Sequence, residues 1–145
     1  MPYTLPSDET LRQLLTNTRT IAVVGHSDRP DRVSYRIAQY LRQAGYHVFP
    51  VNPTVASIDG ERCYATLADL PEAVDMVNVF RRSEFLPAVV EEAIEANARA
   101  VWAQLGISHP DAAAKAQAVG VPLVMDACIK IEHHRLAIQF ASPSQ

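Results

Sequence analysis

The sequence predicts an α/β protein built on a doubly wound parallel sheet, and two observations carry this prediction. Between about residues 20 and 128, short β-rich segments alternate with helix-like segments, which is typical of βαβ units. The first strand-like segment, residues 20–24, is apolar from Ile21 onward and ends at Gly25. A strand without a polar face is covered on both sides, as in a parallel sheet. Right-handed crossovers then favour the doubly wound topology.

Strands and helices are expected in alternation after an N-terminal helix. The predicted strands are the apolar segments at residues 20–24, 46–51, 75–80, 100–105 and 121–125. The predicted helices cover residues 8–16, 33–44, 84–98, 111–119 and about 127–137. Ser7 and Ser83 are the expected N-caps of the first and third helices. Gly45 and Gly120 are expected to end the second and fourth helices.

Length and charge restrict the class of function. A chain of 145 residues is expected to form one domain over residues 1–145. Thirteen Lys and Arg against sixteen Asp and Glu give a formal net charge of −3, so we expect no nucleic-acid partner. The apolar runs are far shorter than the about 20 residues of a membrane-spanning helix, so we expect no membrane insertion.

The cysteines and the N-terminal residues bear on location. Cys63 and Cys128 form no CxxC pair, which argues against a zinc site and a disulfide framework and fits a reducing compartment. Residues 1–6 have neither the charged leader nor the apolar stretch of a signal peptide. We therefore expect a cytoplasmic protein.

The turn after the first strand has the chemistry of a phosphate site. Doubly wound sheets bind ligands at the carboxyl ends of their strands, near the point where the strand order reverses. Gly25 lets a phosphate approach the backbone, and the next helix offers unpaired N–H groups. Ser27 adds a hydroxyl, and Arg29 and Arg32 add positive charge. The alternative is a strand-to-helix turn that binds nothing.

A dinucleotide is disfavoured as the ligand of this turn. The fingerprint for NAD is GxGxxG with an acidic residue about 20 positions further on. Here Ser27 stands in place of the second glycine, and the second strand ends at Asn52 and Pro53 without a carboxylate. An NAD(P)-type oxidoreductase therefore stays an alternative that these residues oppose.

Five segments in order carry a resemblance to a known family. They are IAVVGHS (21–27), DRVSYRIAQYLRQAGYHVFPVNP (31–53), CYATLADLPEAVDMVNVFRRSE (63–84), WAQLGI (102–107) and VMDACIKIEHHRL (124–136). With this spacing the chain resembles the small single-domain coenzyme A-binding proteins of bacteria and archaea. Their domain is similar to the CoA-binding domain of the succinyl-CoA synthetase α subunit. The resemblance runs from about residue 20 to 136 and implies a Rossmann-like CoA-binding fold.

The resemblance also implies a ligand, coenzyme A or an acyl-CoA, and the residues that contact it. The pyrophosphate would lie over Gly25, His26 and Ser27, near Arg32 and Ser34, and the adenosine part beside Val51, Asn52 and Pro53. The adenine and pantetheine side would be closed over by Phe80, Arg81 and Arg82. The pantetheine arm would run past the strand that ends with Trp102, Gln104 and Gly106.

One departure from the family concerns the 3′-phosphate of CoA. Members often carry a basic residue just after the Asn-Pro dipeptide, whereas residues 54–57 of this chain are uncharged. Either Arg32 or Arg36 supplies that contact, or the 3′-phosphate is recognised more weakly.

Several side chains have a structural interpretation beside the functional one. His26 either donates to a phosphate or is an exposed turn histidine, and residues 132–134 (Glu-His-His) are expected to form a solvated helix face. For the Arg81–Arg82 pair the alternative to ligand contact is pairing with Glu84 or Asp75. Trp102 is expected in the core rather than at the ligand.

Cys128 has two interpretations as well. It follows a predicted strand at the start of a predicted helix, where thiol pKa values fall, so it could form a mixed disulfide with CoA or accept an acyl group. The structural interpretation is a buried cysteine.

No catalytic motif accompanies these features. The chain has no GxSxG elbow, HExxH pair or Walker lysine motif, and its length leaves no room for the phosphohistidine domain of succinyl-CoA synthetase. We therefore expect a non-catalytic CoA-binding protein that is a CoA sensor, carrier or redox-linked regulator. A regulatory interaction module with a vestigial nucleotide site is a further alternative. A homodimer or an unidentified protein partner stays open, because the last helix has apolar positions to expose.

Overall fold

A five-stranded parallel sheet forms the centre of the computed structural model, which describes residues 3–139. The sheet order is β2-β1-β5-β6-β7, and every neighbouring pair is parallel. The strands are β1 (Thr20–Val24), β2 (His47–Val51), β5 (Met76–Val79), β6 (Ala100–Ala103) and β7 (Leu123–Val124). The chain steps to one side of β1 for β2 and to its other side for β5. This order confirms the predicted doubly wound, Rossmann-like sheet.

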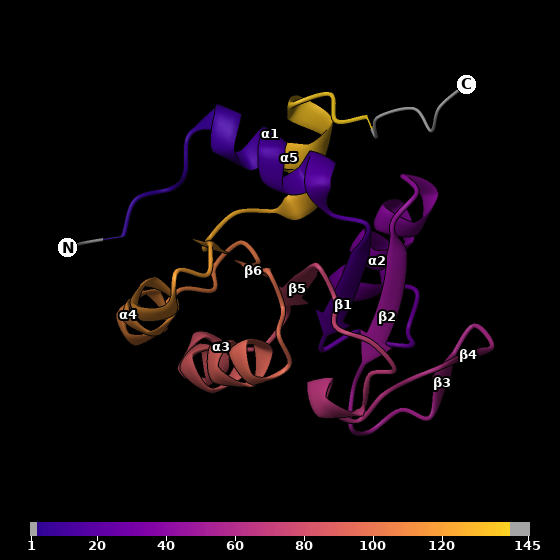
Figure 1. The fold of residues 1–145 in the computed structure, drawn as a ribbon. Coiled ribbons are helices and arrows are strands. Elements are labelled where there is room, and N and C mark those ends of the chain that lie inside the picture. The colour runs from indigo at the N-terminus through magenta and orange to yellow at the C-terminus, as the bar shows by residue number, and fades with distance from the viewer. Residues whose placement is uncertain (1–2, 140–145) are drawn as a thin grey trace.

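Helices cover both faces of the sheet (Figure 1). One layer consists of α1 (Asp8–Asn17), α2 (Val33–Gln43) and α5 (Ile129–Arg135), and the other of α3 (Leu86–Glu95) and α4 (Pro110–Val119). Alternate residues of β1 point into opposite layers: Ile21 packs with Leu11 and Leu41, whereas Ala22 belongs to the core under α3 and α4. The strand is apolar throughout because both of its faces are buried.

Two predicted helix starts were wrong. Ser83 is not an N-cap but begins a short 3₁₀ turn (Ser83–Phe85), and α3 starts at Leu86. The reason is Pro87, which has no N–H and fits only the first turn of a helix. The last helix starts at Ile129 rather than near residue 127, after Asp126 adopts a positive φ of 57°. The Ser7 cap of α1 is confirmed, because its hydroxyl accepts from the Thr10 N–H at 3.2 Å.

A small antiparallel hairpin, β3 (Ser57–Ile58) and β4 (Glu61–Arg62), follows β2 and was not predicted. Its turn is Asp59–Gly60, with both residues at positive φ. An Asp-Gly pair is a strong signal for a two-residue hairpin, so the sequence contained the information. Within residues 3–139, no helix combines the length and apolar character needed to cross a bilayer.

Candidate functional site

The carboxyl ends of neighbouring strands form one continuous edge. Backbone hydrogen bonds extend the ladder beyond the strands, from Gly25 N to Val51 O (2.9 Å), from Phe80 N to Val24 O (2.9 Å) and from Gln104 N to Val79 O (3.2 Å). The strand order reverses between β1 and β5. Ligands of open α/β sheets bind at such a switch point, so the loops after β1 and β5 define the candidate site.

Gly25 is held against the loop that follows β5. Its φ is +87°, and a Cβ built on it would lie 2.7 Å from the carbonyl oxygen of Phe80. Only glycine satisfies both the backbone conformation and the close approach. The loops after β1 and β5 therefore pack closely against each other at Gly25 and the Phe80 carbonyl, where no side chain of residue 25 intervenes.

Side chains lock the β1–α2 loop into one conformation. The Ser34 hydroxyl accepts from the Ser27 N–H at 3.0 Å, and the Ser27 hydroxyl accepts from the Arg29 N–H at 3.0 Å. Asn52 donates through its amide nitrogen to the His26 carbonyl oxygen at 2.9 Å. These contacts bring together five residues predicted for the site, since Gly25 belongs to the same loop. Val51 is buried and borders the loop through its carbonyl, and Pro53 is exposed beside it.

The His26 side chain is buried, so the exposed-turn interpretation was wrong. Its Nδ1 lies 2.8 Å from the Ser27 carbonyl oxygen and its Nε2 lies 3.1 Å from Nη1 of Arg42. Because a guanidinium only donates, Nε2 accepts and Nδ1–H donates, which requires a neutral ring. Both ring nitrogens are therefore hydrogen-bonded within the protein, and the buried ring stabilises the β1–α2 loop. Burial lowers the pKa of His26 to about 4.

We expect acid to weaken the fold through His26. Well above pH 6.5 the ring is neutral in both the folded and the unfolded state. As the pH falls from about 6.5 toward 4, the ring is protonated in the unfolded chain but not in the folded chain. The loss of unfolding free energy reaches on the order of 3 kcal/mol. Denaturant unfolding between pH 7 and pH 4.5 measures it, comparing the wild type with His26→Asn and with a control at the exposed His134. Equal pH slopes for the wild type and His26→Asn would contradict the assignment.

The arginines near the site differ in their partners. Arg29 pairs with Asp31 at 3.4 Å and Arg82 with Glu84 at 3.3 Å, so the structural interpretation holds for Arg82. The guanidinium of Arg81 lies 4.4 Å from the centre of the Phe85 ring.

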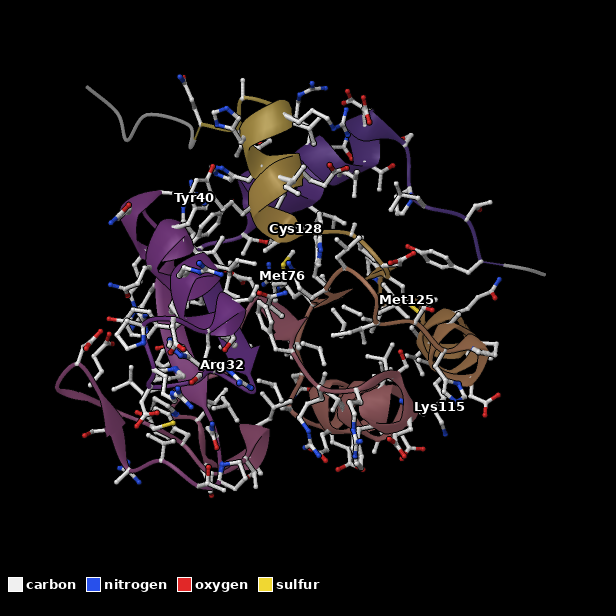
Figure 2. The ribbon with its side chains drawn as sticks, turned by 180° about the vertical axis from the view of Figure 1, so that it is seen from behind. Arg32, Tyr40, Met76, Lys115, Met125 and Cys128 are labelled. Atoms are coloured by element: carbon white, nitrogen blue, oxygen red, sulfur yellow. The ribbon has the colours of Figure 1, made fainter. Side chains whose placement is uncertain are left out.

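Arg32 and Arg36 are exposed, and neither makes an ion pair or a side-chain hydrogen bond within residues 3–139. Figure 2 shows Arg32 at the start of α2. Two cations near the site are therefore available to an anionic ligand.

An open groove of about 740 Å³ lies beside these loops. Six residues predicted for the ligand line it: Phe80, Arg81, Arg82, Gln104, Gly106 and Cys128. The other lining residues are Val33, Ile37, Ser83, Leu105, Ile107 and Ile131. The apolar members were missed. Leu105 was assigned to the predicted strand at residues 100–105, whereas β6 ends at Ala103 and leaves Leu105 in the loop at the ligand edge.

A second depression, of about 680 Å³, lies between the 3₁₀ turn Leu67–Asp69 and α3. Its rim carries Glu72, Glu92 and Glu95 and no arginine or lysine. A phosphorylated ligand would be repelled there. The groove at the switch point is the better candidate for an anionic nucleotide.

Two further predictions concern the packing of α5. Trp102 is fully buried and donates through Nε1 to the Ala127 carbonyl oxygen at 2.9 Å, which confirms its place in the core. The solvated face expected at residues 132–134 was wrong for His133, which is buried and lies with Nδ1 2.8 Å from the Tyr40 hydroxyl. The reason is that α5 packs on α2, and burial lowers the pKa of His133.

Cys128 lines the groove and is partly exposed, at the residue before α5 (Figure 2). Within residues 3–139, no group of three or more His, Cys, Asp or Glu side chains could hold a metal ion.

A doubly wound sheet with a tight glycine loop at its switch point is typical of nucleotide-binding proteins. Comparison with known proteins specifies the class. Residues 19–134 match the family described as CoA binding domain, and the chain belongs to this family.

Relatives of similar length cover nearly the whole chain. The uncharacterized protein YneT of Bacillus subtilis (strain 168) is 41% identical over 128 residues, which is 88% of this chain and 95% of YneT. A hypothetical protein from Pyrococcus horikoshii OT3 has a TM-score of 0.87 and 35% identity, covering 94% of this chain and 99% of that one. A Thermus thermophilus structure has a TM-score of 0.85 and 38% identity, covering 90% and 99%.

The chain also matches part of larger enzymes. The acetate–CoA ligase (ADP-forming) I subunit alpha of Pyrococcus furiosus is 30% identical over 86 residues, which is 55% of this chain but 19% of the subunit. The chain therefore corresponds to a small part of this ligase.

Proposed function

We propose that the protein binds coenzyme A or an acyl-CoA along the carboxyl edge of the sheet, as a sensor or carrier without a catalytic step of its own. The observation that carries the proposal is that a tight backbone loop and an apolar groove adjoin at the switch point. CoA has a pyrophosphate at one end and a long, partly apolar arm at the other. Exposed N–H groups at a helix start suit the first, and a groove suits the second.

Each part of the ligand has a counterpart on this edge. The pyrophosphate lies over Gly25, His26 and Ser27, where α2 begins. The adenosine part lies beside Asn52 and Pro53 at the end of β2. The pantetheine arm follows the groove past Phe80 and Arg81 toward Gln104 and Gly106.

The geometry of Asn52 opposes NAD as the ligand. Its Oδ1 accepts from the Thr54 N–H at 2.9 Å, and its Nδ2 donates to the His26 carbonyl oxygen. NAD-binding domains use a carboxylate near this strand end to accept from the ribose 2′-hydroxyl. Here both polar atoms of the Asn52 amide are instead hydrogen-bonded within the protein.

Thermal unfolding with added ligands tests the proposal. CoA at about 100 times its dissociation constant should raise the free energy of unfolding by roughly 2.7 kcal/mol, whereas NAD and NADP at the same concentration should not. A shift with NAD and none with CoA would favour an oxidoreductase. No shift with either would favour a module with a vestigial site.

Arg32→Ala should weaken CoA binding roughly 10- to 100-fold, because a hydrogen bond to a charged group contributes about 1.5–3 kcal/mol. Calorimetric titration with CoA and with dephospho-CoA, for Arg32→Ala and Arg36→Ala, identifies the residue that contacts the 3′-phosphate. The variant that lacks the 3′-phosphate contact should lose affinity for CoA but keep its affinity for dephospho-CoA. Arg12→Ala, on α1 and paired with Glu9, is the control. Unchanged affinities in both variants would exclude these arginines from the site.

Cys128 lies where the thiol end of the arm would reach the groove. Its thiolate would attack CoA disulfide, forming a protein–CoA disulfide and releasing one CoA thiolate. Intact-mass measurement should find one CoA adduct, removed by reductant and absent in Cys128→Ser. An adduct that persists in that variant would place the reactive thiol elsewhere, namely at the buried Cys63.

A further inference from the structure

Gln104 lies at the groove with its amide held in one orientation. The side chain is 5% exposed, and its Oε1 accepts from the backbone N–H of Ile129 at 3.2 Å. A backbone N–H can only donate, so the atom that faces it must be the amide oxygen and not the nitrogen.

Asn78, on the neighbouring strand, supports the same orientation. Its Nδ2 donates to the Trp102 carbonyl oxygen at 3.1 Å and lies 3.5 Å from Oε1 of Gln104. The Trp102 carbonyl can only accept, so the Asn78 amide is oriented as well. Two backbone groups thus determine both amides, and Gln104 has its oxygen turned toward the protein.

The amide nitrogen of Gln104 is left to the groove. It makes no hydrogen bond within residues 3–139, and Gln104 is one of the residues that line the groove. An unpartnered N–H donor on a nearly buried side chain costs free energy unless a ligand or water accepts from it. The groove therefore offers a positioned donor for an oxygen atom.

The rim of the groove carries three exposed apolar side chains. Val33, Leu105 and Ile131 are 54%, 64% and 57% exposed and lie on three different segments. Of the five large hydrophobic side chains exposed within residues 3–139, these three share one groove. A cluster of exposed apolar side chains around a concave site indicates a ligand with apolar surface.

From these two features we infer that the groove binds the acyl end of an aliphatic acyl-CoA in preference to free CoA. Gln104 Nε2 donates to the thioester carbonyl oxygen, and the acyl chain contacts Leu105 and Ile131. Val33, next to Arg32, borders the arm that leads there. The inference rests on the proposed function and adds the class of ligand. No bond forms or breaks in this step.

Calorimetric titration of the full chain with CoA, acetyl-CoA, butyryl-CoA and hexanoyl-CoA tests the apolar part. Burying a methylene completely improves affinity about fourfold, and an open groove buries it in part. Affinity should therefore rise at least about tenfold from acetyl-CoA to hexanoyl-CoA. Succinyl-CoA, with a carboxylate at the chain end, should bind more weakly than butyryl-CoA. Equal or tighter binding of succinyl-CoA would overturn the aliphatic preference.

Two variants and one ligand pair sharpen the test. In Leu105→Ser/Ile131→Ser the rise with chain length should flatten, while the matched control Val119→Ser, 56% exposed on α4, should retain it. In the wild type, butyryl-CoA should bind more tightly than S-butyl-CoA, a thioether without the carbonyl. In Gln104→Glu at pH 8, one carboxylate oxygen still accepts from the Ile129 N–H, and the other replaces the NH₂ donor that faces the groove. This variant should bind butyryl-CoA no more tightly than S-butyl-CoA.

Failure of the inference is distinguishable from failure of the proposed function. If CoA itself does not bind, the proposed function is wrong. If CoA binds and affinity is independent of chain length, only the inference is wrong. A second copy of the chain could also occupy the apolar rim, and sedimentation of the free protein tests this. If the wild type is a dimer that Leu105→Ser/Ile131→Ser dissociates, and acyl-CoA affinity is unchanged, the rim binds a second copy and not the acyl chain.

Discussion

Gly25→Ala should abolish CoA binding and lower the free energy of unfolding by about 2–5 kcal/mol. At φ +87° any Cβ is strained, which costs roughly 1–2 kcal/mol. The added methyl would also meet the Phe80 carbonyl oxygen at 2.7 Å, and relief of such overpacking costs about 1–3 kcal/mol. Since the displaced backbone belongs to both loops of the proposed site, binding is lost together with stability. Urea unfolding and calorimetric titration with CoA measure the two effects.

Gly60→Ala is the matched control. Gly60 has nearly the same φ, +84°, but a Cβ built on it would have no neighbour within 4 Å. This variant should lose roughly 1–2 kcal/mol from backbone strain alone and bind CoA as the wild type does. If both variants lost equal stability and both bound CoA, the contact between Gly25 and Phe80 would have no role in the site.

Trp102→Ala should lower the free energy of unfolding by about 3–5 kcal/mol. The indole is fully buried between β6 and the layer of α1, α2 and α5. Its removal leaves a cavity and also deprives the Ala127 carbonyl oxygen of its donor at 2.9 Å. Denaturant unfolding monitored by circular dichroism measures the loss, because the variant lacks the only tryptophan of the chain.

Trp102→Phe separates a core role from a ligand role. This change retains most of the volume and loses the hydrogen bond to Ala127, which costs about 1–3 kcal/mol when a buried acceptor is left unpaired. Trp102 does not line the groove, so CoA should bind the folded variant with unchanged affinity. A loss of CoA affinity without a loss of stability would assign the indole to the ligand.

The strand pattern and the position of the candidate site were both predictable from the sequence. Apolar segments such as residues 21–24 indicate a sheet covered on both faces, and right-handed crossovers then leave few topologies. Once the topology is known, the candidate ligand edge follows, and with it Gly25. Phe80 and Gln104 were expected there from the family resemblance. These features depend on neighbours in the chain or on general rules of α/β folds.

What was missed depends on contacts between distant segments. His133 is buried because α5 packs on α2 and Tyr40 lies beside it, and no local pattern around residues 132–134 contains that contact. His26 is enclosed by the side chain of Arg42 from the far end of α2. The orientation of the Gln104 amide depends on Ile129 and Asn78. Such side-chain roles become visible only when the elements are assembled.

We expect CoA to occupy the edge formed by the β1–α2 loop and the groove. Titration of ¹⁵N-labelled protein with CoA, followed by amide chemical shifts, tests it most directly. We expect the largest changes at the backbone amides of Gly25, Ser27, Phe80, Arg81 and Gly106. Changes confined to the acidic depression between residues 66 and 97, or no changes with saturating CoA, would contradict the claim.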